Sequence, residues 1–141
     1  CSLPRRKSLD ACLPDLLFKD EVDLWDVKGW KVHPRYHDLM IDGVMYRHGD
    51  KGKGGRFPAV LNAEQQFCSL VQGHHHQSGG VEYFANELKL IFGMQVGCGV
   101  DHHKAEMDYG KKFNKKPILG AGIVINGKKA IFEPMLLKNK I

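Results

Sequence analysis

The stretch Ser69-Leu70-Val71-Gln72-Gly73-His74-His75-His76 decides how this chain is interpreted. It opens with a short apolar run and closes with consecutive histidines after a glycine. Glycine allows a sharp turn because it has no Cβ, and alternate residues of an extended segment point to the same side. We therefore expect a strand that presents His74 and His76 to one centre, while His75 points elsewhere. Since imidazole is a common ligand of transition metals, the pattern predicts a metal site.

Length and composition are those of one folded domain. The chain has 141 residues, of which 43% are hydrophobic and 26% are charged, so a disordered or fibrous protein is excluded. No apolar run approaches the roughly 18 residues of a membrane span, and we expect no membrane partner. The net charge of +5 favours polyanionic partners only weakly. Because the first residue is Cys1 and not methionine, we expect a fragment or a processed piece of a longer protein.

The cysteines argue for a reducing compartment. They are few, widely spaced and without a CxxC pair, which disfavours a zinc knuckle and a dense disulfide framework. The simplest interpretation is reduced thiols in the cytoplasm at Cys1, Cys12, Cys68 and Cys98.

Short strands and tight turns are expected around the histidine stretch. Two-residue turns at Asp42-Gly43 and Asn126-Gly127 predict hairpins, and Asn62, with Gln65 three residues later, predicts a helix start whose apolar face includes Phe67, Leu70 and Val71. Further helices are expected over Ser8–Phe18 and Asp101–Tyr109. The expected strands are Trp30–Val32, Asp38–Ile41, Val44–His48, Val81–Ala85, Leu88–Val96, Ile118–Ile125 and Lys128–Phe132.

The segment Lys51-Gly52-Lys53-Gly54-Gly55-Arg56 is rich in glycine and positive charge. Backbone amides and the cations Lys51, Lys53 and Arg56 suit a phosphate-bearing substrate. The spacing is not that of a nucleotide P-loop. A basic surface loop without a ligand is an equally open interpretation.

Five short motifs in a fixed order carry a family resemblance: Tyr46-Arg47-His48-Gly49, Gly73-His74-His75-His76, Tyr83-Phe84-Ala85-Asn86, Phe92-Gly93-Met94 and Val96-Gly97-Cys98-Gly99-Val100-Asp101. This order resembles the second half of the calcineurin-like metallophosphoesterases, in particular those carried by bacteriophages. The resemblance implies an α/β fold in which a β-sandwich is flanked by helices in four layers. Residues 1–141 would then be the carboxyl-terminal part of a single domain whose amino-terminal half is missing.

The same resemblance implies a site for two divalent metal ions, which could be Mn, Zn, Fe or Ni. His48 and His74 would bind one ion and His76 the other. The remaining ligands, among them a bridging aspartate, and the proton-donating histidine would lie upstream of Cys1. Arg5 and Arg6 would follow that upstream motif closely and would bind substrate together with Lys51, Lys53 and Arg56.

The expected function is therefore metal-dependent hydrolysis of phosphoesters, with phosphodiesters of nucleic acid or nucleotides as the expected substrates. The 141 residues alone are expected to be inactive, and the intact enzyme is expected in the bacterial cytoplasm or, if phage-encoded, in the host cytoplasm. Two alternatives stay open. One is a non-catalytic module that binds metal and nucleic acid, and the other is a subunit that completes its site with a separate amino-terminal chain.

Overall fold

The structure is a computed structural model, and it describes residues 28–34, 36–99 and 116–135. The chain divides into two units, Cys1–His37 and Asp38–Ile141. In the first unit the rings of His33 and His37 stack with centroids 4.9 Å apart. The strand predicted over Trp30–Val32 is wrong, because these residues have no strand partner among the described residues and Trp30 is 79% exposed. The predicted helices Ser8–Phe18 and Asp101–Tyr109 lie outside the described residues.

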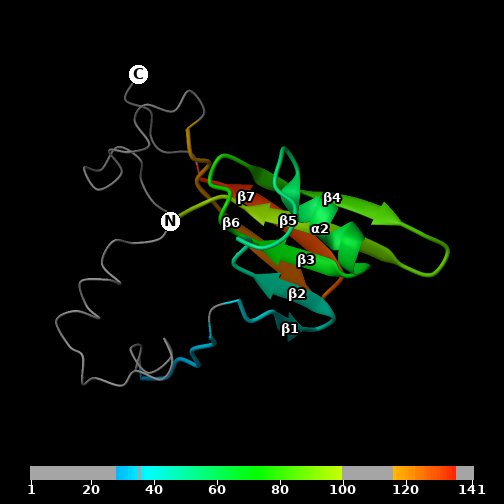
Figure 1. Ribbon diagram of the computed structural model, residues 1–141, viewed down its shortest axis with the longest axis horizontal. Coiled ribbons are helices and arrows are strands. Elements are labelled where there is room, and N and C mark those ends of the chain that lie inside the picture. The colour runs from blue at the N-terminus through cyan, green and yellow to red at the C-terminus, as the bar shows by residue number, and fades with distance from the viewer. Residues whose placement is uncertain (1–27, 35, 100–115, 136–141) are drawn as a thin grey trace. The chain divides into compact units, whose positions relative to one another are not determined.

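The second unit is built on a five-stranded sheet (Figure 1). Its three central strands run parallel, and its two edge strands run antiparallel to their neighbours. All carboxyl ends of the parallel strands therefore meet at one edge of the sheet. In spatial order the strands are β1 (Leu39–Ile41), β2 (Val44–Arg47), β3 (Ser69–Gln72), β5 (Leu90–Val96) and β4 (Gly79–Ala85).

Two hairpins follow the turn residues of the sequence. Strands β1 and β2 are joined by Asp42-Gly43, and both residues have positive φ angles, 49° and 74°. Strands β6 (Gly120–Ile125) and β7 (Lys129–Pro134) are joined by Asn126-Gly127-Lys128, one residue more than predicted, and Asn126 and Gly127 have φ angles of 52° and 65°. Positive φ at both central residues is the requirement of the type I′ turn, which matches the twist of the paired strands. Both hairpin predictions are confirmed.

The helix α2 (Pro58–Gln66) starts four residues before the predicted cap. Pro58 stands in the first turn, where its missing N–H costs no hydrogen bond. The prediction that Asn62 caps a helix is wrong, because Asn62 lies inside α2, is 1% exposed and hydrogen-bonds the backbone of Lys53. The helix ends at Phe67 in the left-handed conformation, so Leu70 and Val71 belong to β3 and not to a helical face.

Successive residues of β3 face two separate cores. Leu70 packs under α2 with Ala59 and Ala63. Val71 packs on the opposite face with a cluster that includes Phe92. Strand alternation produces this division, and full burial on both faces explains the continuous apolar run.

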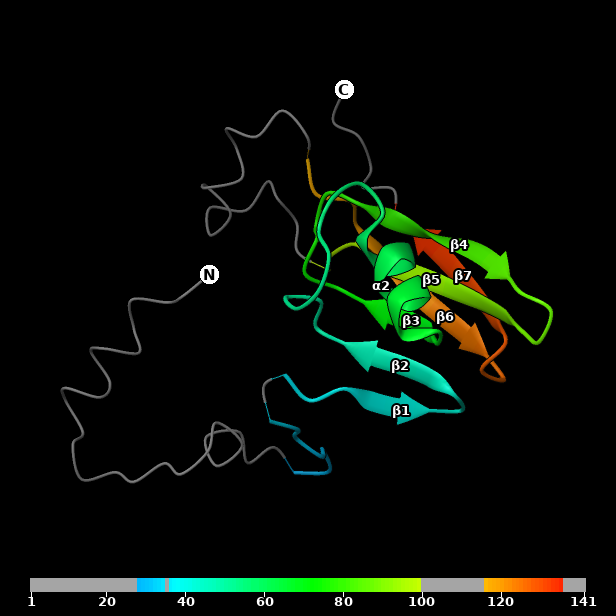
Figure 2. The ribbon, with the colours of Figure 1, turned by 45° about the vertical axis from the view of Figure 1, so that its right-hand side comes forward.

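The described residues thus form three layers of a mixed α/β fold. Figure 2 shows α2 on one face of the five-stranded sheet and the β6–β7 hairpin on the other. The hairpin is held by Tyr83 of β4, whose hydroxyl accepts a hydrogen bond from the Ala130 N–H (2.7 Å) and donates one to the Ala130 carbonyl (3.0 Å). None of the helices described is long and apolar enough to cross a membrane.

Candidate metal centre

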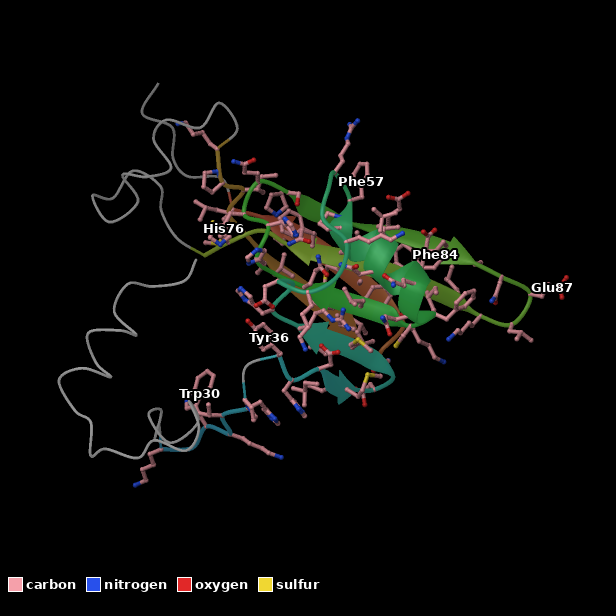
Figure 3. The ribbon with its side chains drawn as sticks, viewed as in Figure 1. Trp30, Tyr36, Phe57, His76, Phe84 and Glu87 are labelled. Atoms are coloured by element: carbon pink, nitrogen blue, oxygen red, sulfur yellow. The ribbon has the colours of Figure 1, made fainter. Side chains whose placement is uncertain are left out.

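The predicted histidines follow the carboxyl ends of adjacent parallel strands. Arg47, the last residue of β2, is in register with Gln72, the last residue of β3. His48 and the Gly73–His76 segment therefore leave the sheet side by side. Figure 3 places His76 at this edge and Glu87, in the β4–β5 turn, at the opposite edge. Such edges are where open α/β sheets bind their ligands.

His48 and His74 are in direct contact. The Nδ1 atom of His74 lies 3.1 Å from the Nε2 atom of His48, and the ring centroids are 5.0 Å apart at an interplanar angle of 75°. In the absence of a cation one ring must donate a proton to the other. With a cation between them, both nitrogens would act as ligands.

The spacing of these two nitrogens fits a shared metal ion. Nitrogen ligands at about 2.0–2.1 Å from one ion are about 2.9 Å apart at a right angle and about 3.4 Å apart at the tetrahedral angle. The observed 3.1 Å lies between these limits. The donor chemistry of His48 and His74 and the distance between their nitrogens are therefore compatible with a metal that accepts imidazole, and the same distance is that of a direct N–H···N hydrogen bond.

The histidine segment is a turn and not the extended strand that the sequence predicts. Strand β3 ends at Gln72, and His74 has a left-handed φ of 66°. The N–H of His75 bonds the carbonyl of Gly73 at 2.8 Å, which closes a γ-turn with His74 at its centre. Strand alternation no longer applies in such a turn. The expectation that His75 diverges is wrong as well, because its ring meets that of His74 edge to face at 5.1 Å.

His75 is partly buried, and its surroundings disfavour a positive charge on its ring. Burial is the main cause of a lowered pKa for His75, and the neighbouring His74 and His76 lower it further. The neutral ring is therefore favoured at this position.

His76 is held by its backbone at the start of the following turn. Its carbonyl accepts a hydrogen bond from the N–H of Ile118 at 2.7 Å. Among the described residues no three His, Cys, Asp or Glu side chains converge closely enough to hold a metal ion. His76 thus does not complete a three-residue centre with His48 and His74.

The basic loop from Lys51 to Arg56 borders the histidine turn. A Cβ atom built on Gly54 would lie 3.9 Å from Cε1 of His75, so the loop backbone passes within van der Waals reach of that ring. Lys51, Lys53 and Arg56 are exposed, and the guanidinium of Arg56 lies over the Phe57 ring at 5.2 Å. The loop that carries these three cations therefore passes beside His75. Arg5 and Arg6 lie outside the described residues.

Sequence reasoning missed the amides beneath this edge. Gln72 and Gln95 are in register on β3 and β5, and they are 1% and 5% exposed. Their sequence signal is weak: Gln72 stands directly before Gly73, and Gln95 stands among the apolar residues of β5. Sequence reasoning also missed why position 49 is a glycine. Its φ is 101°, and a Cβ there would lie 2.9 Å from the Gly73 carbonyl oxygen.

Comparison of the chain with protein-family models, with curated proteins and with solved structures found no match.

Proposed function

We propose that this chain is the carboxyl-terminal part of a calcineurin-like metallophosphoesterase that hydrolyses phosphoesters, with phosphodiesters of nucleic acid or nucleotides as substrates. The observation that supports this most strongly is the 3.1 Å approach of the His48 and His74 ring nitrogens. These residues come from two motifs of the resemblance, and the fold brings them together at the ends of two parallel strands.

In this proposal His48 and His74 hold one divalent ion, and His76 turns toward a second ion when the remaining ligands are present. The two ions would supply Lewis acidity that stabilises charge on the phosphoryl oxygens. The residues of this chain orient the substrate: Lys51, Lys53 and Arg56 pair with its phosphate oxygens from the adjacent loop. Arg5 and Arg6 are proposed to do the same from the amino-terminal side.

The proposed parent fold has four layers, and the described residues of the second unit form three layers. The outward face of the β6–β7 hairpin is apolar, with Ile123 49% and Ile125 42% exposed. A further helical layer over that face would remove these side chains from water. The resemblance also places the carboxylate ligands and the proton-donating histidine before residue 1, in an enzyme of the bacterial or phage-infected cytoplasm.

A second candidate is a non-catalytic module that binds metal and nucleic acid. It is favoured by the His48–His74 contact and the exposed basic loop, which both lie within the described residues. The exposed Lys51–Arg56 loop would then contact a nucleic-acid backbone.

One experiment separates the two candidates. The natural reading frame upstream of residue 1 is sequenced, and both the longer chain and the 141-residue chain are assayed with bis-(p-nitrophenyl) phosphate in Mn²⁺, Ni²⁺ or Zn²⁺. The enzyme proposal expects upstream D-x-H, G-D-x-x-D and G-N-H motifs, turnover by the longer chain only, and loss of turnover in its His74→Ala variant. His75→Ala should keep most of the turnover. A longer chain with no turnover, but with metal-dependent nucleic-acid binding, would support the module.

A further inference from the structure

Three buried amides form one continuous chain of hydrogen bonds beneath the candidate metal centre. The Asn62 amide nitrogen donates to Gln72 Oε1 at 3.1 Å, and Gln72 Nε2 donates to Gln95 Oε1 at 3.1 Å. The Gln95 amide nitrogen in turn donates to the carbonyl of Gly73. At the other end, Asn62 Oδ1 accepts from the backbone N–H of Lys53 at 2.7 Å. The chain therefore runs from the basic loop to the histidine turn.

The direction of every amide in this chain is fixed by its partners. Gln72 and Gln95 each accept with the oxygen on the side of the loop and donate with the nitrogen on the side of the histidines. Asn62 accepts from the Lys53 N–H, and its nitrogen donates both to Gln72 and to the Lys53 carbonyl at 3.2 Å. A side-chain amide offers one acceptor end and one donor end, so rotating any one of the three would place like atoms in contact. The arrangement is a single defined network and not a set of interchangeable contacts.

The network ends on the backbone atoms that set the positions of His48 and His74. The Gly73 carbonyl accepts from both Gln95 and the N–H of His75, and the second of these bonds closes the γ-turn that carries His74. The Gly73 N–H donates to the carbonyl of His48 at 3.1 Å. Gly73 thus joins both histidines: Gln95 bonds the carbonyl of the Gly73–His74 peptide, and the N–H of the preceding Gln72–Gly73 peptide bonds His48.

Packing alone does not account for these residues. Apolar side chains could fill the space between α2 and the sheet, whereas a buried amide costs free energy unless all its partners are in place. A left-handed γ-turn at a residue with a side chain is also unfavourable and persists only where its surroundings hold it. The chain of buried amides and the strained turn at His74 both end on the Gly73 carbonyl.

We propose that Asn62, Gln72 and Gln95 are positioning residues that hold His74 against His48 and couple this pair to the Lys51–Arg56 loop. The proposal rests on the proposed function only where it treats the two histidines as ligands. Loop movement caused by a bound phosphoester would then reach the histidine turn through hydrogen bonds, and the Gly73 peptide would keep the two ring nitrogens at metal-binding distance.

The test compares Gln95→Met with Val71→Ala in the 141-residue chain. Gln95→Met has a similar shape but cannot donate to Gly73. Val71→Ala removes buried volume from the neighbouring strand on the opposite face, and so controls for lost stability. The measurements are ¹H–¹⁵N spectra of the imidazoles without metal and hydrogen exchange of the His75 amide, corrected for global unfolding. Co²⁺ titration then follows metal binding by visible absorption.

In Gln95→Met, His75 amide exchange should rise on the order of tenfold, as loss of a buried hydrogen bond implies, and the hydrogen-bonded imidazole signal of the His48–His74 pair should disappear. Val71→Ala should leave both signals as in the original chain. Asn62→Ala, at the loop end of the network, should shift the His75 amide in the same direction. Unchanged imidazole and amide signals in a folded Gln95→Met variant would overturn the proposal.

If Gln95→Met does not fold, Gln95→Asn provides the same test, because its shorter amide does not reach Gly73. Failure of the original chain to bind Co²⁺ would show only that His48 and His74 are not a sufficient metal site without the upstream ligands. The proposed function is tested separately, by turnover of the longer chain. The imidazole and His75 amide signals recorded without metal would still support or overturn the positioning role of Asn62, Gln72 and Gln95.

Discussion

Replacing Gly49 by alanine should test how closely the Gly49 backbone approaches Gly73, provided that the strain of a positive φ at position 49 is measured separately. Gly49 has a φ of 101°, and a Cβ there would lie 2.9 Å from the Gly73 carbonyl oxygen and 3.2 Å from Gln72 Cβ. Gly55 has nearly the same φ, 104°, but a Cβ there would meet nothing within 4 Å. Gly55→Ala is therefore a matched control for Gly49→Ala.

The magnitude follows from that difference. An L-residue in the left-handed region costs roughly 1–2 kcal/mol, and both variants carry this term together with the same effect on the unfolded chain. Only Gly49→Ala adds an overpacking term of about 1–3 kcal/mol, because the atoms it meets belong to the backbone of β3's carboxyl end and to a buried side chain. The free energy of unfolding of Gly49→Ala should thus be lower than that of Gly55→Ala by about 1–3 kcal/mol.

Urea unfolding monitored by far-UV circular dichroism measures this difference, provided that both variants keep the m-value of the original chain. The extra methyl group should also push the His48 segment away from Gly73, so Gly49→Ala should weaken Co²⁺ binding while Gly55→Ala should not. Equal stability of the two variants would refute the close approach of the His48 and Gly73 segments.

Three further outcomes are expected. Gly93→Ala should lower the free energy of unfolding in urea by about 1–3 kcal/mol, because the added Cβ would lie 2.6 Å from the backbone of α2. A Cβ at Gly99 would meet nothing within 4 Å, so the control Gly99→Ala should change that free energy by less than about 0.5 kcal/mol. Tyr83→Phe should cost about 1–3 kcal/mol in the same assay, because the backbone groups of Ala130 lose their hydroxyl partner, and an unchanged midpoint would contradict this link between β4 and β7. NMR titration should show that the pKa of His75 in the folded chain is below 6.5. The unfolded chain then binds this proton at a higher pH than the folded chain, so the free energy of unfolding should fall as the pH drops below 6.5. The fall should be less steep in His75→Gln.

The chain's turns were predictable because their causes are local. Asp42-Gly43 and Asn126-Gly127 tolerate positive φ at both central positions, and this property alone selects the hairpins that they form. The strand before Gly73 was predictable from its apolar run, and so was the position of His48 and His74 at the ends of neighbouring strands. A short apolar strand that is buried on both faces belongs in the middle of a parallel sheet, and residues that follow parallel strands lie at the same edge of that sheet.

The errors at Asn62 and His74 share a different cause, since the conformation of each residue depends on partners that are distant in the sequence. Asn62 has the side chain of a helix cap, yet in the structure it lies inside α2 and bonds the Lys53 backbone and Gln72. His74 was expected in an extended strand, but its backbone is left-handed, and Gln95 and the His75 N–H both bond the Gly73 carbonyl beside it.

The sequence by itself determined the turns, the buried strands and the presence of imidazoles at one edge, because short-range sterics and hydrophobic periodicity act between neighbours in the chain. Only the tertiary structure decided which imidazoles meet. The 3.1 Å contact of His48 with His74 depends on the register of β2 and β3 and on the hydrogen bonds that Gly73 makes. One of these comes from Gln95, a residue 22 positions away whose amide reaches the Gly73 carbonyl only after the sheet has formed.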